Sequence, residues 1–490
     1  FTLAKGRKKA TFDYTVYPRN EQSRNRQSFN TSDVVYLIMS DRFVDGDESN
    51  NSTDCTAEKA DKSNVHGRFG GDIQGIINSL DYIAETGATA IWPTPLLLDN
   101  ESAWSYHGYA CADYYHIDPR FGSNELYCQM VEAAHQRGIK VLMDMVPNHC
   151  GSTHWWMNDY PYADWINTFP DYTTTNNVFS ANYDINASQY DRELNNSAWF
   201  DHSMPDMNMR NPDLLQYFKQ WAIWWIEYAR LNGIRQDTYP YADREMMRDW
   251  CVALDEQYPG FNVTGETWIN NGPGVAYWQK DSKLSDFNTE LKTPMDFPLM
   301  TLLNQQAGEE TDEWNSGLAR IYEYLTGDIV YENTDNLLTF LANHDTDRFL
   351  GDGKDVNALK QGLALLLTIN RIPQLYYGTE ILMNGSKTIT DGNVRMDFPG
   401  GFPGDSRSAF TKDGRTAEEN AMFDWLKNLL HWRQNNDVII KGKQKHYTPQ
   451  DGVYVMSHEY NGKHVLLILN GTSKPAVFKS SRYAEDIPQN

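Results

Sequence analysis

Short apolar runs alternate with amphipathic segments from residue 33 onward, and this rhythm predicts a repeating strand–helix fold. The runs 34–39, 88–95 and 140–149 have the length of buried strands. The segment 76–87 carries apolar residues at helical spacing and ends at glycine. The further strands are predicted at 233–239, 261–268, 296–300, 337–345 and 372–381, and the further helices at 123–138, 211–233, 244–259, 357–370 and 417–435.

This many strand–helix repeats indicate a parallel sheet with helical crossovers, of the α/β class. Their number favours a closed (β/α)8 TIM barrel over an open, doubly wound sheet. Residues 31–437 are therefore assigned to a barrel, and 150–208, rich in Asn, Asp, Tyr and Trp and without a strong period, to a small inserted domain after strand 3.

Both ends of the chain depart from this rhythm. Residues 1–30 begin with two short strands around a Gly-Arg-Lys turn, which predicts an N-terminal arm or the remnant of an upstream β-domain. Residues 438–490 alternate like strands, in the runs 452–460, 464–472 and 476–480, and predict a C-terminal antiparallel β-domain. The first residue is Phe1, so we expect a mature or trimmed chain.

Charge and composition narrow the classes of partner. The 490 residues include 43 Lys and Arg against 66 Asp and Glu, a net charge of −23. Such an acidic chain repels phosphate backbones and anionic membranes, so nucleic acid is a poor partner. No apolar run reaches the roughly 18–20 residues that span a bilayer. The five cysteines form no CxxC pair, which disfavours a zinc site.

Polar side chains gather where the predicted strands end. Asp144, Asp237, Glu266 and the run 343–345 each follow a different strand. In a (β/α)8 barrel these strand ends meet at one face, which carries the active site. Arg235 precedes Asp237 by two residues, on the same face of its strand, and can keep that carboxylate ionised. One attacking carboxylate and one protonated donor are what cleavage of a glycosidic bond requires.

Four short motifs occur in order along the chain: DMVPNH (144–149), GIRQDTYPY (233–241), GETW (265–268) and FLANHD (340–345). In order and spacing they resemble those of the α-amylase superfamily of glycoside hydrolases. The stretch MPDMN (204–208) is similar to the form found in neopullulanases, cyclomaltodextrinases and oligo-1,6-glucosidases. As a whole the chain looks like a maltooligosaccharide-processing enzyme of a bacterial starch-utilisation system.

The resemblance implies roles for the matching residues. Asp237 matches the nucleophile, Glu266 the general acid/base and Asp345 the transition-state stabiliser. The implied reaction is a retaining double displacement, with the two reacting carboxyl groups about 5–5.5 Å apart. The remaining matches are to substrate contacts and their supports: Arg235, which positions the nucleophile; His149 and His344, which bond the same sugar; Tyr106, which stacks under it beside His107; and Asp144, which with Asn148 holds the loop after strand 3.

One departure concerns the side of the leaving sugar. α-Amylases usually carry Lys-His three and four residues after the nucleophile, whereas this chain has Pro240 and Tyr241. We expect aromatic stacking to replace those contacts, with Trp155 of the inserted segment as a candidate. The bond preference of ordinary starch amylases therefore does not transfer.

Two loops concentrate hard oxygen donors. Residues 41–51 supply Asp45, Asp47, Asn50 and Asn51, and residues 67–75 supply Asp72 and the Gly70 carbonyl. The spacing is not an EF-hand, because the twelfth position is Thr56, and bare loops of this kind are mostly solvated turns. Similar paired segments bind calcium in cyclodextrin-processing relatives, so the resemblance implies a structural Ca²⁺.

The leading hypothesis is a hydrolase of α-1,4 bonds in starch, maltooligosaccharides, pullulan or cyclodextrins, and cleavage of α-1,6 bonds as well stays open. The first alternative is a transglycosylase, since a sugar can take the same covalent intermediate. The second is a non-catalytic glycan-binding protein, which would have lost a carboxylate. We expect a periplasmic, secreted or cell-surface location, and an absent N-terminal β-domain could mediate a homodimer.

Overall fold

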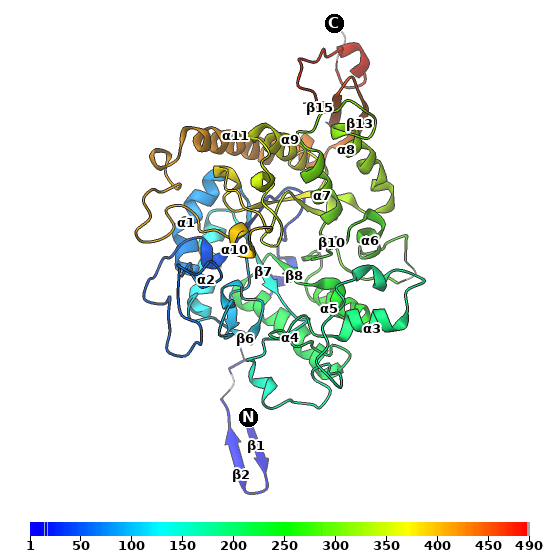
Figure 1. Cartoon of the computed structure of the whole chain (residues 1–490). Helices are drawn as coiled ribbons and strands as arrows, with labels where there is room; N and C mark the ends of the chain where they lie inside the picture. Colours follow the sequence, from blue (N-terminus) through cyan, green and yellow to red (C-terminus); the bar gives the residue numbers. More distant parts are fainter. Residues whose placement is uncertain (14, 17, 286, 488–490) are drawn as a thin grey trace.

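Eight short parallel strands form the centre of the computed structural model, which describes residues 1–487 apart from 14, 17 and 286. Their order in the sheet is β10-β9-β8-β7-β4-β3-β12-β11. A parallel bridge between Met295 and Leu338 closes the sheet, so the predicted barrel is confirmed (Figure 1). Its strands are β3 (Val35–Ile38), β4 (Ala90–Pro93), β7 (Lys140–Met145), β8 (Gly233–Gln236), β9 (Asn262–Gly265), β10 (Thr293–Pro294), β11 (Leu338–Phe340) and β12 (Ile372–Tyr376).

Helices surround these strands, and their ends follow local capping chemistry. The Asp72 carboxylate caps the first helix by accepting a hydrogen bond from the Gly75 amide, and Gly87 ends that helix at φ 94°. Ser123 caps the second helix as predicted. The helices are α1 (Ile73–Thr86), α2 (Asn124–Gln136), α3 (Gln189–Ser197), α4 (Pro212–Ala229), α5 (Arg244–Gln257), α6 (Gly272–Tyr277), α7 (Phe297–Gln306), α8 (Gly317–Leu325), α9 (Val356–Leu366), α10 (Asp391–Val394), α11 (Ala417–Gln434) and α12 (Asp437–Lys441).

The sixth strand was predicted in the wrong place. Residues 296–300 open α7, and the strand is the two-residue β10 before them. The Asp296 carboxylate accepts a hydrogen bond from the Leu299 amide, and Pro298 lies in the first helical turn. Both features favour a helix start over a strand, because proline lacks the amide that a strand ladder needs.

The segment between β7 and α4 carries little regular structure besides α3. Antiparallel bridges join His149 to Asp206 and Ile166 to Met207, so its two ends lie together. A second irregular insertion carries the antiparallel pair β5 (Leu97–Asp99) and β6 (Cys111–Ile117), which was not predicted. Both segments leave the barrel at the carboxyl ends of strands, where they can shape a site.

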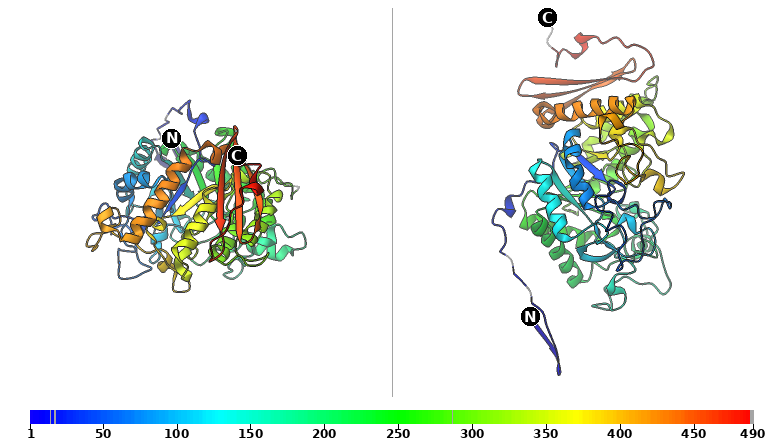
Figure 2. Two further views of the ribbon diagram at one scale, coloured as in Figure 1. Left: turned by 90° about the horizontal axis from the view of Figure 1, so that it is seen from above. Right: turned by 90° about the vertical axis from the view of Figure 1, so that its left-hand side faces the viewer.

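The two ends of the chain lie on opposite sides of the barrel (Figures 1 and 2). The hairpin of β1 (Thr2–Lys5) and β2 (Lys8–Thr11) is exposed and projects away. The C-terminal sheet contains β13 (Lys443–Gln450), β14 (Val453–Tyr460) and β15 (Lys463–Asn470). The strand predicted at 476–480 is wrong, because residues 476–479 form no regular structure and Ser480 opens a short turn, and β13 is the third strand of the sheet instead.

Asp486 fastens the end of the chain to this sheet. Its buried carboxylate accepts hydrogen bonds from Ser457 (2.9 Å) and His464 (2.8 Å) as well as from Tyr447. Burial disfavours the ionised carboxylate and by itself would raise its pKa. The hydrogen bonds have the larger effect and lower the pKa of Asp486 to about 2. The carboxylate therefore contributes stability that is fully present above its unfolded pKa, near 4, and is lost as the pH falls toward 2.

We predict that Asp486→Ala lowers the free energy of unfolding by about 1.5–3 kcal/mol, because it leaves buried donors without an acceptor. Thermal unfolding of the variant and the parent between pH 3 and 7 measures this. The difference should shrink below pH 4. A constant difference across that range would mean that packing, and not the ionised carboxylate, stabilises the sheet.

Candidate active site

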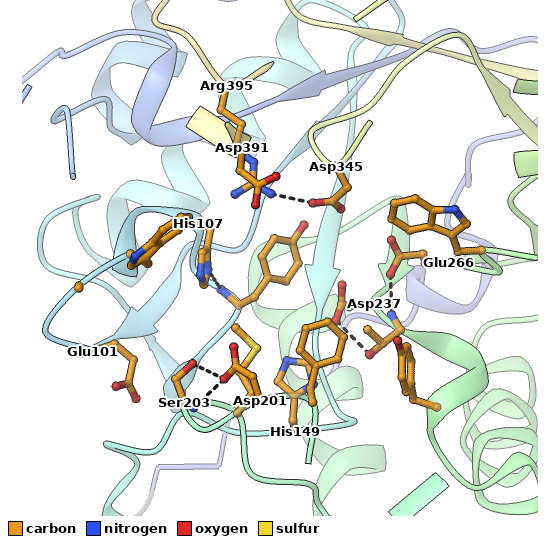
Figure 3. A pocket seen from close by; sticks show the side chains of 18 of the residues that line it. Glu101, His107, His149, Asp201, Ser203, Asp237, Glu266, Asp345, Asp391 and Arg395 are labelled. Atoms are coloured by element: carbon orange, nitrogen blue, oxygen red, sulfur yellow. Dashed lines mark hydrogen bonds and ion pairs between the residues drawn. The ribbon is translucent and has the colours of Figure 1, made fainter. Parts of the chain in front are cut away.

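A pocket of about 690 Å³ opens at the carboxyl ends of the barrel strands (Figure 3). Three of the predicted residues, Asp237, Glu266 and Asp345, line it together with His107 and His149. Figure 3 shows Asp237, Glu266 and Asp345 approaching one another across the pocket from separate strand ends. The further lining residues used below are Glu101, Trp104, Tyr109, Phe179, Phe200, Asp201, Tyr241, Trp268, Asp391 and Arg395.

Arg235 lies beneath this pocket and is fully buried. Its Nη1 donates to Asp237 Oδ1 (2.6 Å) and to Asp144 Oδ1 (2.9 Å). Its Nη2 lies 2.8 Å from Glu266 Oε1. One guanidinium therefore holds three carboxyl groups, two of which face the pocket.

Asp144 lies below the pocket and not in its wall. Its Oδ2 accepts hydrogen bonds from Trp92 Nε1 (2.9 Å) and from the Tyr109 hydroxyl (3.0 Å). Together with the bond from Arg235, these contacts give Asp144 the supporting place that the sequence predicted. It acts on a ligand only through the groups that it holds.

Asp345 has a cation of its own. Arg395 Nη2 lies 2.7 Å from its Oδ1, and His344 Nε2 lies 2.9 Å from its Oδ2. Burial alone would raise the pKa of Asp345, but the His344 and Arg395 contacts hold it well below the ordinary value. Burial lowers the pKa of His344. His344 and the permanently charged Arg395 together keep Asp345 ionised.

The two carboxyl groups on Arg235 differ in their electrostatic surroundings. Burial and the neighbouring charges of Asp237 and Asp345 raise the pKa of Glu266 to about 7, although the positive charge of Arg235 lowers it. Burial also raises the pKa of Asp237, but the hydrogen bonds from Arg235 and Thr238 favour its ionised form. Of the two groups, Glu266 therefore keeps its proton to the higher pH, and Asp237 ionises first.

The tyrosine in the pocket is not the one that the sequence indicated. Tyr106 is fully buried, with its hydroxyl accepting a bond from Arg395 Nη1 (3.0 Å), and it does not line the pocket. Tyr109 does line it, and its hydroxyl bonds His344 Nε2 (2.7 Å). The turn at Ser105–His107 and Gly108 (φ 80°) reverses the chain, so the second tyrosine of SYHGY reaches the site.

The histidines fall into two groups. His107 and His149 line the pocket, and burial lowers their pKa values to about 3 and about 4, so both rings are neutral. His149 Nε2 is buried and has no hydrogen-bond partner in the described part of the chain. It is therefore available to a ligand hydroxyl. His344 lies behind the wall and acts through Asp345 and Tyr109.

Aromatic rings line the side of the pocket beside Glu266, but Trp155 is not among them. Trp155 lies outside the pocket wall with its ring 57% exposed, so that prediction is corrected. Its neighbours His154 and Trp156 pack against Tyr114 beneath the inserted segment. The rings that line this side of the pocket are Tyr241, Phe179, Phe200 and Trp268.

Arg395 and Trp104 are site residues that sequence reasoning missed. Arg395 lies in the loop after β12, far from every motif, and a single Arg in a polar loop gives no signal. Trp104 precedes SYHGY by one residue and could have been noted as an aromatic beside a motif. Tyr109 closes the run SYHGY (105–109) that also holds the predicted Tyr106 and His107, and only the turn geometry selects it.

The six predicted calcium-site residues lie in the loops before α1. Asp45 Oδ2 accepts a hydrogen bond from Asn51 Nδ2 (2.7 Å), and Asp72 Oδ2 accepts one from Asn50 Nδ2 (3.0 Å). Gly70 lies against the Asn51 side chain, and the Asp47 amide donates to Asp72. Within the described residues no three His, Cys, Asp or Glu side chains form a metal cluster. A cation at this place would therefore need the side-chain amide oxygens of Asn50 and Asn51 in addition to carboxylate oxygens.

Two comparisons with protein families cover nearly the whole chain. The family described as "Alpha amylase, catalytic domain" matches residues 37–438. The chain belongs to the alpha-amylase family. Residues 444–490 match the cyclo-malto-dextrinase C-terminal domain. These spans agree with a barrel followed by a separate C-terminal sheet.

Several alpha-amylase family members are similar over most of this chain. The cyclomaltodextrin glucanotransferase of Geobacillus stearothermophilus is 29% identical over 92% of the chain, and the chain spans only 60% of that relative. The cyclomaltodextrinase of Thermoanaerobacter pseudethanolicus is 27% identical over 91% of the chain and 71% of the relative. The crystal structure of an Anoxybacillus alpha-amylase covers 91% of this chain and 88% of its own, with 27% identity and a TM-score of 0.73.

We predict that Glu266 carries a proton up to about pH 7 in this alpha-amylase family site, because burial and two neighbouring carboxylates disfavour its charge. Infrared difference titration of the parent against Glu266→Gln should show a protonated-carboxyl band that disappears near neutral pH. Glu101→Gln, at another pocket-lining carboxyl, is the matched control. A band that disappears near pH 4.5 would refute the assignment.

Proposed function

We propose that this protein is a retaining α-glucan hydrolase that cleaves glucosidic bonds by double displacement. Asp237 attacks the anomeric carbon while Glu266 gives its proton to the leaving oxygen, so a covalent glycosyl-enzyme forms and the leaving sugar departs. Glu266 then removes a proton from water, which attacks the same carbon and releases Asp237. Asp345 holds ring hydroxyls of the sugar through both steps.

The observation that carries this proposal is the sharing of Arg235 by Asp237 and Glu266. The guanidinium binds both carboxyl groups at 2.6 and 2.8 Å. This arrangement supports one ionised nucleophile and one protonated donor side by side, which is the pair that the reaction needs. The presence of all three motif carboxylates, Asp237, Glu266 and Asp345, weighs against a non-catalytic glycan-binding role.

Transglycosylation is the second candidate, because a similar protein bears the name cyclomaltodextrin glucanotransferase. The two reactions share the covalent intermediate and differ in whether water or a sugar hydroxyl takes it. Tyr241 and the rings around it give the acceptor side an apolar surface. The ring centroids of Tyr241 and Phe179 lie 4.4 Å apart. Such a surface supports binding of a sugar acceptor.

We predict that the purified protein opens γ-cyclodextrin and pullulan and attacks soluble starch more slowly. Chromatography of the products from the three substrates in parallel measures this. Glucan products longer than the substrate would show that the protein also catalyses transglycosylation. Rapid loss of starch with intact cyclodextrin would indicate instead an endo-acting amylase with an open cleft.

Asp237→Asn should lower kcat on every substrate at least about a thousandfold, because the amide cannot form the glycosyl-enzyme. Asp201→Asn is the matched control, since Asp201 also lines the pocket but accepts its hydrogen bonds from Ser203. Retention of full activity in Asp237→Asn would overturn the nucleophile assignment.

We further propose that Asp45, Asn50 and Asn51, with the Gly70 carbonyl, hold a structural Ca²⁺. Three buried oxygens, Asp45 Oδ1, Asn50 Oδ1 and Asn51 Oδ1, have no hydrogen-bond partner among the described residues. Hard oxygens left unpaired in this way suit calcium. Both carboxylate oxygens of Asp72 already accept hydrogen bonds from backbone amides, and Asp47 accepts one from the Ser49 hydroxyl. We therefore assign these two residues to the support of the loop and not to the cation.

Removal of calcium should lower the unfolding temperature by about 2–4 °C or more, as expected for a ligand present at a hundred times its Kd. Thermal unfolding with chelator, and again after added CaCl₂, measures the shift. Asn51→Ala should abolish the dependence on calcium, whereas Asp61→Asn, at an exposed turn, should keep it. A parent that ignores both chelator and calcium would refute the site.

An α-glucan is the proposed partner of this chain. In its described part no helix is both long and apolar enough to cross a membrane. The location outside the cytoplasm, the homodimer and the separation of the two reacting carboxyl groups stay predictions.

A further inference from the structure

The pocket has one aromatic wall that the catalytic proposal does not use. Trp104 lines the pocket with its ring 40% exposed. The His66 ring stacks on it at a centroid distance of 3.9 Å and an interplanar angle of 23°. His66 comes from a different loop, so two segments distant in sequence build one flat surface.

The backbone at Trp104 is held in an unfavourable conformation. Its φ of 65° and ψ of 4° lie in the left-handed region, which costs a bulky non-glycine residue free energy. The next residue keeps it there: the Glu58 carboxylate accepts bonds from the Ser105 amide and hydroxyl, both at 2.7 Å, and Arg68 Nη1 donates to the Ser105 carbonyl at 3.0 Å. Strain that the surroundings enforce in this way is typical of functional positions.

The loop that carries His66 is equally fixed. Arg42 Nη2 donates to the carbonyls of Val65 (3.1 Å) and Gly67 (2.8 Å), on either side of His66. His66 Nε2 bonds the hydroxyl of Thr390, which caps α10 in the pocket wall. The stacked pair is therefore positioned before any ligand arrives, which lowers the entropy cost of binding.

The location of the pair defines which part of a glucan it meets. Glu266 must lie at the leaving oxygen, so the sugar retained on the enzyme lies on the other side of the cleaved bond. Figure 3 shows Glu101 and His107, which flank Trp104 in the sequence, across the pocket from Glu266. Tyr106 connects Trp104 to His107, with ring centroids 6.5 and 5.7 Å away.

We propose that Trp104, backed by His66, binds the glucosyl unit next to the one held at Asp237, on the non-reducing side, and thereby favours longer donor chains. The inference deepens the proposed function and rests on it. A pyranose presents an apolar C–H face to an aromatic ring, and the neutral, preformed surface matches that face. Trp104 is thus a specificity-determining residue, while the bond cleavage stays with Asp237 and Glu266.

Nitrophenyl glycosides test this, because the nitrophenyl group occupies the leaving side and only the donor side grows. The measured quantity is kcat/KM for 4-nitrophenyl α-maltoside divided by that for 4-nitrophenyl α-glucoside. We expect this ratio to fall about tenfold in Trp104→Gly, a loss typical of removing a buried aromatic contact. Trp104→Phe should keep much of the ratio, and Trp155→Ala, at an exposed Trp outside the pocket, should keep all of it.

Glycine adopts φ 65° without strain, and this gain offsets part of the stacking on His66 that the variant loses. We therefore expect Trp104→Gly to fold and to unfold in a single thermal transition, so that a changed ratio reports binding. An unchanged ratio, or equal losses on both glycosides, would overturn the role of Trp104 and leave the proposed hydrolase intact. A parent that cleaves neither glycoside nor starch would overturn the proposed function, and this inference with it.

Discussion

The buried guanidinium of Arg235 is the constraint on which the rest of the site depends. A cation without solvent must be paired, and here it meets Asp144, Asp237 and Glu266 together. Three ionised carboxylates around one cation would leave two uncompensated charges in a medium of low dielectric. Retention of one proton relieves this, and Glu266 holds it because Asp345 adds a further negative charge nearby. The same contact thus fixes both geometry and protonation.

The barrel supplies this contact through strand register. Asp144 on β7 pairs with Arg235 on β8, and Arg235 pairs with Thr264 on β9. The ladder continues past the strand ends, since the Asp237 amide donates to Met145 and the Glu266 amide to Gln236, both at 2.9 Å. Asp144 and Arg235 stand at one level, and Asp237 and Glu266 lie two residues further along on the same faces of their strands, so the four side chains converge. A slip of one residue would turn Arg235 away from its partners.

The sequence allowed prediction of whatever depends on strand ends, since Asp237, Glu266 and Asp345 follow apolar runs that had to be strands. It did not allow prediction of what depends on turns and weak strands. Tyr106 and Tyr109 are equivalent by type and differ only through the reversal at Gly108. The two residues of β10 are too few to leave a pattern, so the helix start at Asp296 was mistaken for the strand. Arg395 reaches Asp345 from a loop that has no periodicity.

The two sides of the pocket are held by different kinds of contact, charged on one side and apolar on the other. The side of the retained sugar is braced by buried arginines: Arg42 holds the loop of His66, and Arg395 holds Asp345. The opposite side, which we propose for the leaving sugar, carries rings of the inserted segment that contact Tyr241. In the proposed reaction the rigid charge pairs fix the position of the cleaved bond. Apolar contacts tolerate substitution by other rings, so the choice of acceptor can change while Arg235 and its carboxylates stay in place.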